Sequence, residues 1–388
     1  MRLLAYVVDI DRIRAIEVVA GSSIEHDFGP SAAILDDHDE LVRDLASPAA
    51  LSQPTVPTLE RFAAGWGRRL LPPAWLSGPP RTAVIVPNSF LHGLPFHLIR
   101  TESGNPLCVE SAVSISSSLT LLERCLARSE HRASGRIDPF LHGGVRSGSR
   151  FLLAGVDALG HSDAAWRALP LDLLRACGED PETSAQNVRH LSMRDMLLQA
   201  MSGRAYEMAI IAAHGYGDTT DAFGSGLVAA ANTWGFVGRP ISVLGSAVDA
   251  DGVRLMTQDL PHYPVPSELS PSMPSEMLTL RDLERSAHLS CPLVALLGCS
   301  TARPFLHPGD QPVSIADLIL KIGASAVVAP LWDVTLTAVS AWMTTFLVAW
   351  RRTGLSLGEA SRTACKERHD AGAPLHETGC LVLHGNFR

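Results

Sequence analysis

Cysteine pairs, lysine and long apolar runs are all scarce in this sequence of 388 residues. The cysteines are odd in number and no two have the Cys-x-x-Cys spacing, so neither a disulfide scaffold nor a zinc site is expected. This usage fits a reducing compartment best, and we expect a cytoplasmic protein with no metal and no cofactor. The seven cysteines stand at positions 108, 125, 177, 291, 299, 365 and 380.

The apolar runs are too short for a targeting or membrane segment. The N terminus offers about six apolar residues before Asp9, which is too few for a secretory signal. The most apolar late stretch, residues 334–350, contains five Ser or Thr residues and is expected to be a buried helix. A net charge of −8 and a pI near 6.0 argue against a nucleic-acid or membrane partner.

What is present is the composition of a globular protein, with 46% apolar and 19% charged residues and enough length for a large core. In the N-terminal part, alternating apolar residues at 3–8 and 13–19 predict a β-hairpin, and 82–86 predicts a buried strand ended by Pro87. Prolines break the helical pattern of residues 41–71, and a helix is expected over 116–126.

The C-terminal half alternates apolar strands with helices. Strands this apolar, separated by helices, indicate a mostly parallel sheet that is covered on both faces. The expected strands are 151–156, 208–213, 293–297 and 326–331, and the expected helices are 192–201, 314–322 and 338–350.

Two of these strands end at residues that can carry chemistry. The strand over 208–213 runs into His214 and Gly215, and the strand over 293–297 runs into Gly298 and Cys299. In an open parallel sheet, the carboxyl ends of neighbouring strands face one crevice. If these two strands are neighbours, His214 and Cys299 converge.

This pair suits thiol catalysis. A thiolate is a nucleophile, and a nearby imidazole accepts the thiol proton and later protonates the leaving amine. The Gly215 and Cys299 amides are natural donors to an oxyanion, since a glycine lets the backbone approach closely. From the residues alone a plain alternative stays open, because a cysteine at a strand end is often a small buried apolar side chain.

Several segments, in order across nearly the whole chain, resemble the CHAT domain, a branch of the caspase-like (clan CD) cysteine peptidases related to separase. LLAYVVDIDRIRAIEVV resembles the first strands, AVIVPNSFLHGLPFHLI the strand-Pro-x-x-x-Leu-His-x-Leu-Pro-Phe signature, and SISSSLTLL the Ser-Ile-x-x-Ser-x-x-x-Leu segment. AIIAAHG and LVALLGCSTA match the catalytic histidine and cysteine motifs, and GASAVVAPLWDV resembles the strand and Leu-Trp-x-Val that follow.

The resemblance implies a caspase-like three-layer α/β sandwich, with a mostly parallel central sheet flanked by helices. A smaller pseudo-caspase-like half over residues 1–130 would precede it, then a linker over 131–149 and the catalytic half over 150–388. The polar, Gly-rich composition near residue 140 independently favours a boundary there.

The resemblance also assigns roles to matching residues. His214 and Cys299 take the catalytic dyad and Gly215 an oxyanion role. His92 and Pro95 belong to the first-half signature and are expected to be packing residues, with His92 as a second base the less favoured alternative.

The substrate site departs from the family pattern. Gly298 and Ser300 stand where the family usually has Ala and an acidic residue, and no Asp precedes Cys299, which argues against cleavage after Arg or Lys. Arg303 is either a site for an acidic substrate residue or a solvated surface side chain. Pocket-lining roles are also expected for Asp333, which is the better candidate, for its neighbour Trp332 and for Asp310; the side-chain preference stays open.

The expected function is that of a regulated intracellular cysteine endopeptidase that cuts a specific partner protein. The CHAT domain fills the chain, which implies activation in trans by a separate activator or sensor, in bacterial antiviral defence or cell death. The alternatives are a catalytically silent interaction module and another thiol hydrolase, such as a thioesterase or amidase. The Pro- and Ser-rich insert 261–277 is expected to be an exposed loop that contacts substrate or is self-cleaved, or else a surface insertion.

Overall fold

A computed structural model gives the fold, and it centres on one sheet of twelve strands. The strands follow the order β3-β2-β1-β4-β5-β19-β18-β15-β9-β6-β7, and β8 pairs with β15 beside this path. The residues that the structure describes are 1–32, 34–35, 37–38, 41, 57–134, 151–155, 164–179, 188–190, 198, 201–213, 215–216, 226–228, 247–248, 254–255, 277–286, 288–307 and 311–388.

The N-terminal half contributes five strands. The predicted hairpin is confirmed, since β1 and β2 pair antiparallel, and the predicted strand over 82–86 is β4. A third antiparallel strand, β3, was not predicted because its residues are mostly exposed and lack apolar alternation. The five strands are β1 (Arg2–Val8), β2 (Arg12–Val19), β3 (Ser22–Pro30), β4 (Thr82–Val86) and β5 (Ala112–Ile115).

The C-terminal half contributes the rest of the large sheet. Its central strands β9, β15 and β18 are parallel and almost wholly buried, as their continuous apolar sequences predict. The strands are β6 (Phe151–Gly155), β7 (Val188–His190), β8 (Ser202–Ala205), β9 (Met208–Ala212), β15 (His288–Leu296), β18 (Ala324–Ala329) and β19 (Val382–Gly385). Small satellite sheets are formed by β10 (Gly215–Tyr216), β11 (Gly226–Val228) and β14 (Met277–Thr279), by β12 (Ala247–Val248) and β13 (Arg254–Leu255), and by β16 (Phe305–His307) and β17 (Gln311–Val313).

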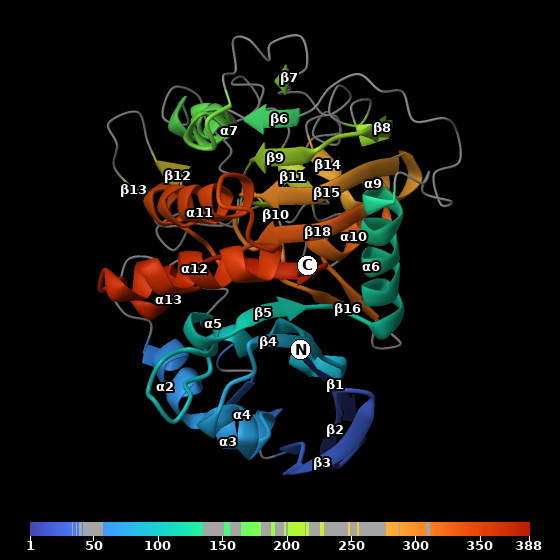
Figure 1. Ribbon diagram of the computed structural model, residues 1–388, viewed down its shortest axis with the longest axis vertical. Helices are drawn as coiled ribbons and strands as arrows, with labels where there is room; N and C mark the ends of the chain where they lie inside the picture. The colour runs from blue at the N-terminus through green and yellow to red at the C-terminus, as the bar shows by residue number, and fades with distance from the viewer. Residues whose placement is uncertain are drawn as a thin grey trace.

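Helices cover both faces of the sheet, with α7, α11 and α12 packed together on one and α9 with α10 on the other (Figure 1). The α/β class expected from the sequence, a mostly parallel sheet flanked by helices, is confirmed. The helices are α2 (Pro57–Gly65), α3 (Gly67–Leu70), α4 (Pro73–Ser77), α5 (Leu107–Glu110), α6 (Leu119–Ala133), α7 (Ala164–Ala176), α9 (Leu280–Ser286), α10 (Ile315–Lys321), α11 (Leu336–Arg351), α12 (Leu357–Asp370) and α13 (Leu375–Thr378). Two short 3-10 helices, η2 (Ser89–Gly93) and η3 (Phe96–Leu98), follow β4.

Local sequence signals fix the helix starts. Ser314 accepts a hydrogen bond from the Asp317 amide at 2.9 Å at the start of α10, as predicted, and Ser118 does the same for Leu121 at 3.1 Å in α6. The stretch expected to be a buried helix over 338–350 is α11, whose inward face is fully buried. The helix expected over 192–201 lies outside the described residues apart from 198 and 201, and so does the insert 261–277 apart from Met277. The linker expected over 131–149 lies outside them from residue 135 on, whereas its first residues, 131–133, form the end of α6.

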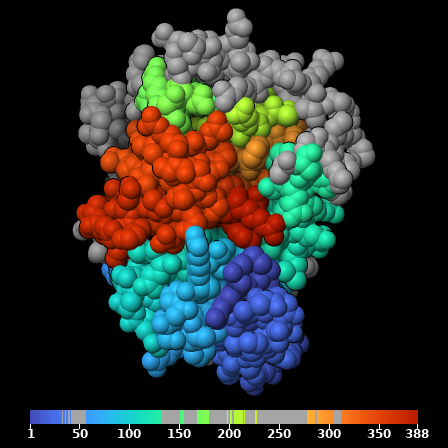
Figure 2. All heavy atoms as spheres, viewed as in Figure 1, coloured from blue at the N-terminus to red at the C-terminus, as the bar shows by residue number. Residues whose placement is uncertain are grey.

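The strand β19 joins the two halves of the sheet. It runs parallel to β5 of the N-terminal half and antiparallel to β18 of the C-terminal half. Figure 2 shows α11 and α12, in orange and red, covering the face of the molecule above the N-terminal residues, in blue. The division into two sequence regions therefore coexists with a single continuous sheet.

Candidate active site

The two strands that lead to the predicted dyad are neighbours in the sheet. β9 and β15 are parallel, with Ile210 opposite Ala295, and the Leu297 amide donates to the Ile211 carbonyl at 2.8 Å. Their carboxyl ends therefore meet at the same edge, where a parallel sheet gathers its functional groups. Cys299 follows β15 at this edge, and His214 itself lies outside the described residues.

The residues on either side of position 214 touch the cysteine turn. A Cβ placed on Gly215 would lie 2.0 Å from the Cys299 carbonyl oxygen, and a Cβ on Gly298 would lie 2.4 Å from the Ala213 carbonyl oxygen. Contacts this short leave no room for any side chain at either position. Both glycines are thus required by a backbone-to-backbone approach of the two loops.

The turn that carries Cys299 is held from within and from the adjacent loop. Thr301 is fully buried, and its hydroxyl donates to the Gly298 carbonyl at 2.9 Å. Ser300 has a φ of +56°, a left-handed conformation that is unfavourable for a residue with a Cβ. Its amide donates to the Trp332 carbonyl at 3.2 Å and its hydroxyl to Asp333 Oδ1 at 3.2 Å.

Cys299 is buried, with 7% of its surface exposed, beneath the loop that follows β18. Its Sγ lies 4.0 Å from the Val334 carbonyl oxygen, at the limit of a weak thiol hydrogen bond. Further along the turn, the Ala302 amide donates to the Pro330 carbonyl at 2.8 Å. The cysteine turn and the loop 330–334 are therefore hydrogen-bonded to each other at several points along their length.

The structure places three of the four predicted substrate residues around this turn. Trp332 and Asp333 are buried in the loop after β18, and Arg303, which is partly buried, closes the cysteine turn by donating its amide to the Ser300 carbonyl at 3.0 Å. Burial lowers the pKa of the Arg303 guanidinium, and the charge of Asp333 partly opposes this shift. Asp310 lies outside the described residues.

The first-half signature also borders this region. His92 lies in η2, which contacts β17, and a Cβ on the next residue, Gly93, would meet Pro304 at 3.9 Å. His92 is buried and desolvation lowers its pKa to about 4. Pro95 starts the second short helix, η3, whose residues are all buried. The signature thus packs against the segment that follows the cysteine turn.

Sequence reasoning gave no role to three residues of this neighbourhood. Ser300 was noted only as a departure from the family pattern, and its positive φ has no signal in the sequence. Thr301 packs its methyl group between the two loops, since a Cβ on Gly298 would lie 3.1 Å from it. His97, two residues after Pro95, stacks on Trp332 with ring centroids 6.0 Å apart and planes 8° apart.

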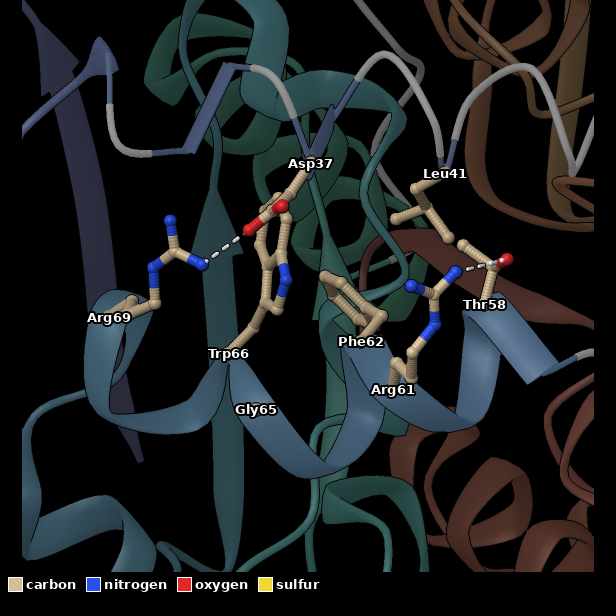
Figure 3. A pocket seen from close by; sticks show the side chains of 8 residues that line it. All are labelled: Asp37, Leu41, Thr58, Arg61, Phe62, Gly65, Trp66 and Arg69. Atoms are coloured by element: carbon tan, nitrogen blue, oxygen red, sulfur yellow. Dashed lines mark hydrogen bonds and ion pairs between the residues drawn. The ribbon is translucent and has the colours of Figure 1, made fainter.

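A separate cavity of about 220 Å³ lies in the N-terminal half, between α2, α3 and the residues before them (Figure 3). Arg69 pairs with Asp37 at 2.7 Å across it, and the Arg69 guanidinium lies 5.2 Å from the centroid of the Trp66 ring. The lining residues are Asp37, Leu41, Thr58, Arg61, Phe62, Gly65, Trp66 and Arg69. None of the predicted site residues is among them, so this cavity is distinct from the cysteine turn.

The described part of the chain contains no candidate metal cluster and no candidate membrane helix. No group of three or more His, Cys, Asp or Glu side chains there is arranged to hold a metal ion. Across the same residues, no helix has both the length and the apolar character needed to span a membrane.

The solved structures with distant similarity to this chain include two peptidases, separase and gingipain R. Separase from Saccharomyces cerevisiae, in its complex with securin, matches at 13% identity and a TM-score of 0.42, over 78% of this chain and 16% of the separase chain. Gingipain R (RgpB), an Arg-specific cysteine proteinase, matches at 9% identity and a TM-score of 0.45, over 92% of this chain and 75% of its own. RgpB of Porphyromonas gingivalis in the complex of its pro- and mature domains gives the same identity and TM-score.

Sequence comparison identifies the family. No curated protein sequence matches the chain. This chain spans only 16% of the length of the separase chain that it matches. A family model for the CHAT domain matches residues 66–374, which include the first-half signature and both catalytic motifs. The resemblance stated from the sequence motifs is therefore confirmed, and the chain belongs to the CHAT domain family.

Proposed function

We propose that this protein is a cysteine endopeptidase in which Cys299 is the nucleophile and His214 its acid/base partner. The observation that carries the proposal is the contact between the two loops: Ala213 and Gly215, on either side of His214, both approach the Gly298–Cys299 backbone more closely than any side chain allows. Membership of the CHAT family supports the same assignment.

In the proposed reaction, His214 takes the proton of the Cys299 thiol, and the thiolate sulfur adds to the carbonyl carbon of the scissile peptide bond. The amides of Gly215 and Cys299 donate hydrogen bonds to the resulting oxyanion. The C–N bond then breaks, and the imidazolium of His214 protonates the leaving amine. Water, deprotonated by His214, hydrolyses the thioester and returns the thiol to its resting state.

Trp332, Asp333 and Arg303 are the proposed lining of the pocket for the residue before the scissile bond, with Asp310 as a fourth member. Support comes from their position, because the loop of Trp332 and Asp333 is hydrogen-bonded to Ser300, the residue after the nucleophile. Asp333 is 5% exposed and its charge acts on the partly buried Arg303, so the proposed lining includes one charge of each sign. Asp333→Asn should change the cleavage profile of a peptide library more than the total rate.

The proposed substrate is one specific protein, cut at an exposed loop inside the cell. We base the intracellular setting on the odd number and wide spacing of the cysteines. Activation in trans by a partner protein, in bacterial defence or cell death, is the regulation we propose from the family resemblance. Loop 261–277 is the segment proposed to contact substrate or to be self-processed.

Two other functions fit the same fold. A catalytically silent interaction module would bind its partner equally well with Cys299 replaced, and a thioesterase or amidase would cleave small thioesters or amides in preference to proteins. We favour catalysis over silence because the chain retains both His214 and Cys299 in the family's motifs. A cleavage assay that offers proteins, small thioesters and small amides separates the three functions: a peptidase cuts proteins, a thioesterase or amidase cuts the small substrates, and an interaction module cuts nothing.

The test compares wild type with Cys299→Ala and His214→Ala against an unbiased peptide library and a proteome digest. Both variants should fold and lose all cleavage, because each removes one member of the dyad. Cys177→Ala, which removes another buried thiol at the end of α7, is the matched control and should cleave like wild type. Cleavage that persists in Cys299→Ala would rule out the proposed mechanism.

A further inference from the structure

A run of buried contacts leads from the cysteine turn to the N-terminal half of the chain. We propose that Ser300, Asp333, Trp332 and His97 are positioning residues for Cys299, so that a side chain of the N-terminal half sets the reactivity of the nucleophile. The inference rests on the proposed role of Cys299. It adds residues to which the catalytic motifs assign nothing.

The first link is Ser300. Its φ of +56° is disfavoured for a residue with a Cβ, so the turn needs outside support to keep this conformation. Both of its polar groups receive that support from one loop, since the amide donates to the Trp332 carbonyl and the hydroxyl to Asp333 Oδ1, each at 3.2 Å. Ser300 follows Cys299 directly, so a shift of its backbone moves the thiol.

The second link is Trp332, whose side chain is buried with 4% of the residue exposed. Its indole Nε1 donates to the His376 carbonyl at 3.3 Å, which fixes the edge of the ring. Its face lies on the His97 ring at a centroid distance of 6.0 Å and an angle of 8°, an offset parallel stack. The Trp332 carbonyl, which accepts the hydrogen bond from the Ser300 amide, therefore belongs to a residue whose side chain is held at its edge by His376 and on one face by His97.

The third link is His97, which is 2% exposed and lies in η3. Its Nε2 donates to the Gly379 carbonyl at 2.9 Å, so Nε2 carries the proton. Desolvation lowers its pKa to about 4, and the ring is neutral at pH 7. Gly379 has no space for a side chain, because a Cβ would lie 2.5 Å from Leu98 Cδ2 and 2.8 Å from the His97 ring. His97 is thus a rigid platform at the far end of this run of contacts.

The functional consequence follows from geometry. General-base activation of a thiol requires the sulfur to lie within hydrogen-bond reach of the imidazole. A displacement of about 1 Å between reacting groups can lower a rate about a hundredfold. Because the cysteine turn adopts an unfavourable φ and is held by the 330–334 loop, loosening that loop at Trp332 should move Cys299 while the rest of the sheet stays folded.

The test measures alkylation of Cys299 by iodoacetamide from pH 5.5 to 9, followed by mass spectrometry of the Cys299 peptide. This reagent is too small to use a substrate pocket, so the proposed pocket roles of Trp332 and Asp333 do not affect it. Ser300→Ala should lower the rate constant about three- to tenfold, the range of one lost hydrogen bond, and shift its pH profile upward. His97→Ala, which removes the ring stacked on Trp332, should have an effect of about the same size. His97→Phe keeps a flat ring for Trp332 and should retain most of the rate. Ser77→Ala, at an exposed position of α4, is the control for loss of a serine hydroxyl and should match wild type.

A double-mutant cycle decides whether the residues act together. If Ser300 and His97 belong to one run of contacts, the double variant should lose less than the product of the two single losses. Fully multiplicative losses, or a rate and pH profile unchanged in His97→Ala, would overturn the inference. Should His97→Ala fail to fold, an unchanged rate in both Ser300→Ala and Trp332→Leu overturns it instead. A wild-type Cys299 that reacts no faster than buried Cys177 would instead refute the proposed function.

Discussion

Replacing Gly215 with alanine should separate the two loops of the candidate active site. The added Cβ would start 2.0 Å from the Cys299 carbonyl oxygen and 3.1 Å from the Cys299 carbonyl carbon. Both contacts are with backbone, so no side-chain rotation relieves them. An ordinary Cβ contact begins near 3.4 Å, so the loops must move apart by about 1.4 Å.

The size of this movement sets the expected effect. A misplacement of about 1 Å lowers catalysis about a hundredfold, so peptidase activity and Cys299 alkylation in Gly215→Ala should fall by about that factor or more. Inserting a methyl group into this tight contact should also lower the free energy of unfolding by about 1–3 kcal/mol. Urea unfolding followed by circular dichroism measures the loss of stability, and mass spectrometry of the Cys299 peptide measures the loss of alkylation.

The control is Gly65→Ala at the end of α2, where a Cβ meets nothing within 4 Å. It should leave alkylation unchanged and alter stability by less than about 1 kcal/mol. The reasoning is refuted if Gly215→Ala alkylates at the wild-type rate while remaining folded. In that case the approach of the two loops would have no part in the reactivity of Cys299.

Three further predictions concern stability. Burial of Glu17 in β2 acts to raise its pKa, but hydrogen bonds to the Trp75 indole and the His26 imidazole outweigh burial and lower that pKa. Glu17 should therefore contribute stability that is lost as the pH falls through the lowered pKa. Glu17→Gln should make this loss smaller in urea titrations at acid pH. Desolvation lowers the pKa values of the buried side chains of His97, His92 and His384 to between about 3 and 4. Because the unfolded chain binds these protons at a higher pH, unfolding should become easier as the pH falls from 6.5 towards 4. An unchanged urea midpoint across that pH range would contradict the burial argument. Arg128 donates from α6 to three backbone carbonyls at the end of α10 and the start of β18. Arg128→Met leaves these carbonyls without their donor and should lower the free energy of unfolding by about 1–3 kcal/mol, without altering the Cys299 alkylation rate per folded molecule.

The sequence predicted the parts of the fold that depend on local pattern. The continuous apolar runs before His214 and Cys299 indicated buried parallel strands, and these are β9 and β15. Ser314 indicated the start of α10, because a serine N-cap is a strictly local signal. The predicted Cys/His site also requires β9 and β15 to be neighbours, and only the strand order of the folded sheet shows that they are.

The remainder depends on long-range contacts that leave no local trace. β19 is four residues long, and its place between β5 and β18 is set by pairing with strands far away in the chain. The positive φ of Ser300 arises from hydrogen bonds to Trp332 and Asp333, so a serine there gives no warning of it. His97 lies inside a recognisable signature, but its stack on Trp332 joins residues more than two hundred positions apart. The roles of His214, Gly215 and Cys299 stay predictions that the proposed variants test.

The position of β19 has a consequence for the order of events during synthesis. The ribosome completes Cys299 and the whole of β18 before it makes residues 382–385, yet β18 has no partner on that edge until β19 docks. Until then β5 also lacks its neighbour, and the N-terminal strands cannot join the rest of the sheet. A growing chain would therefore carry Cys299 for some time without the completed sheet that positions it.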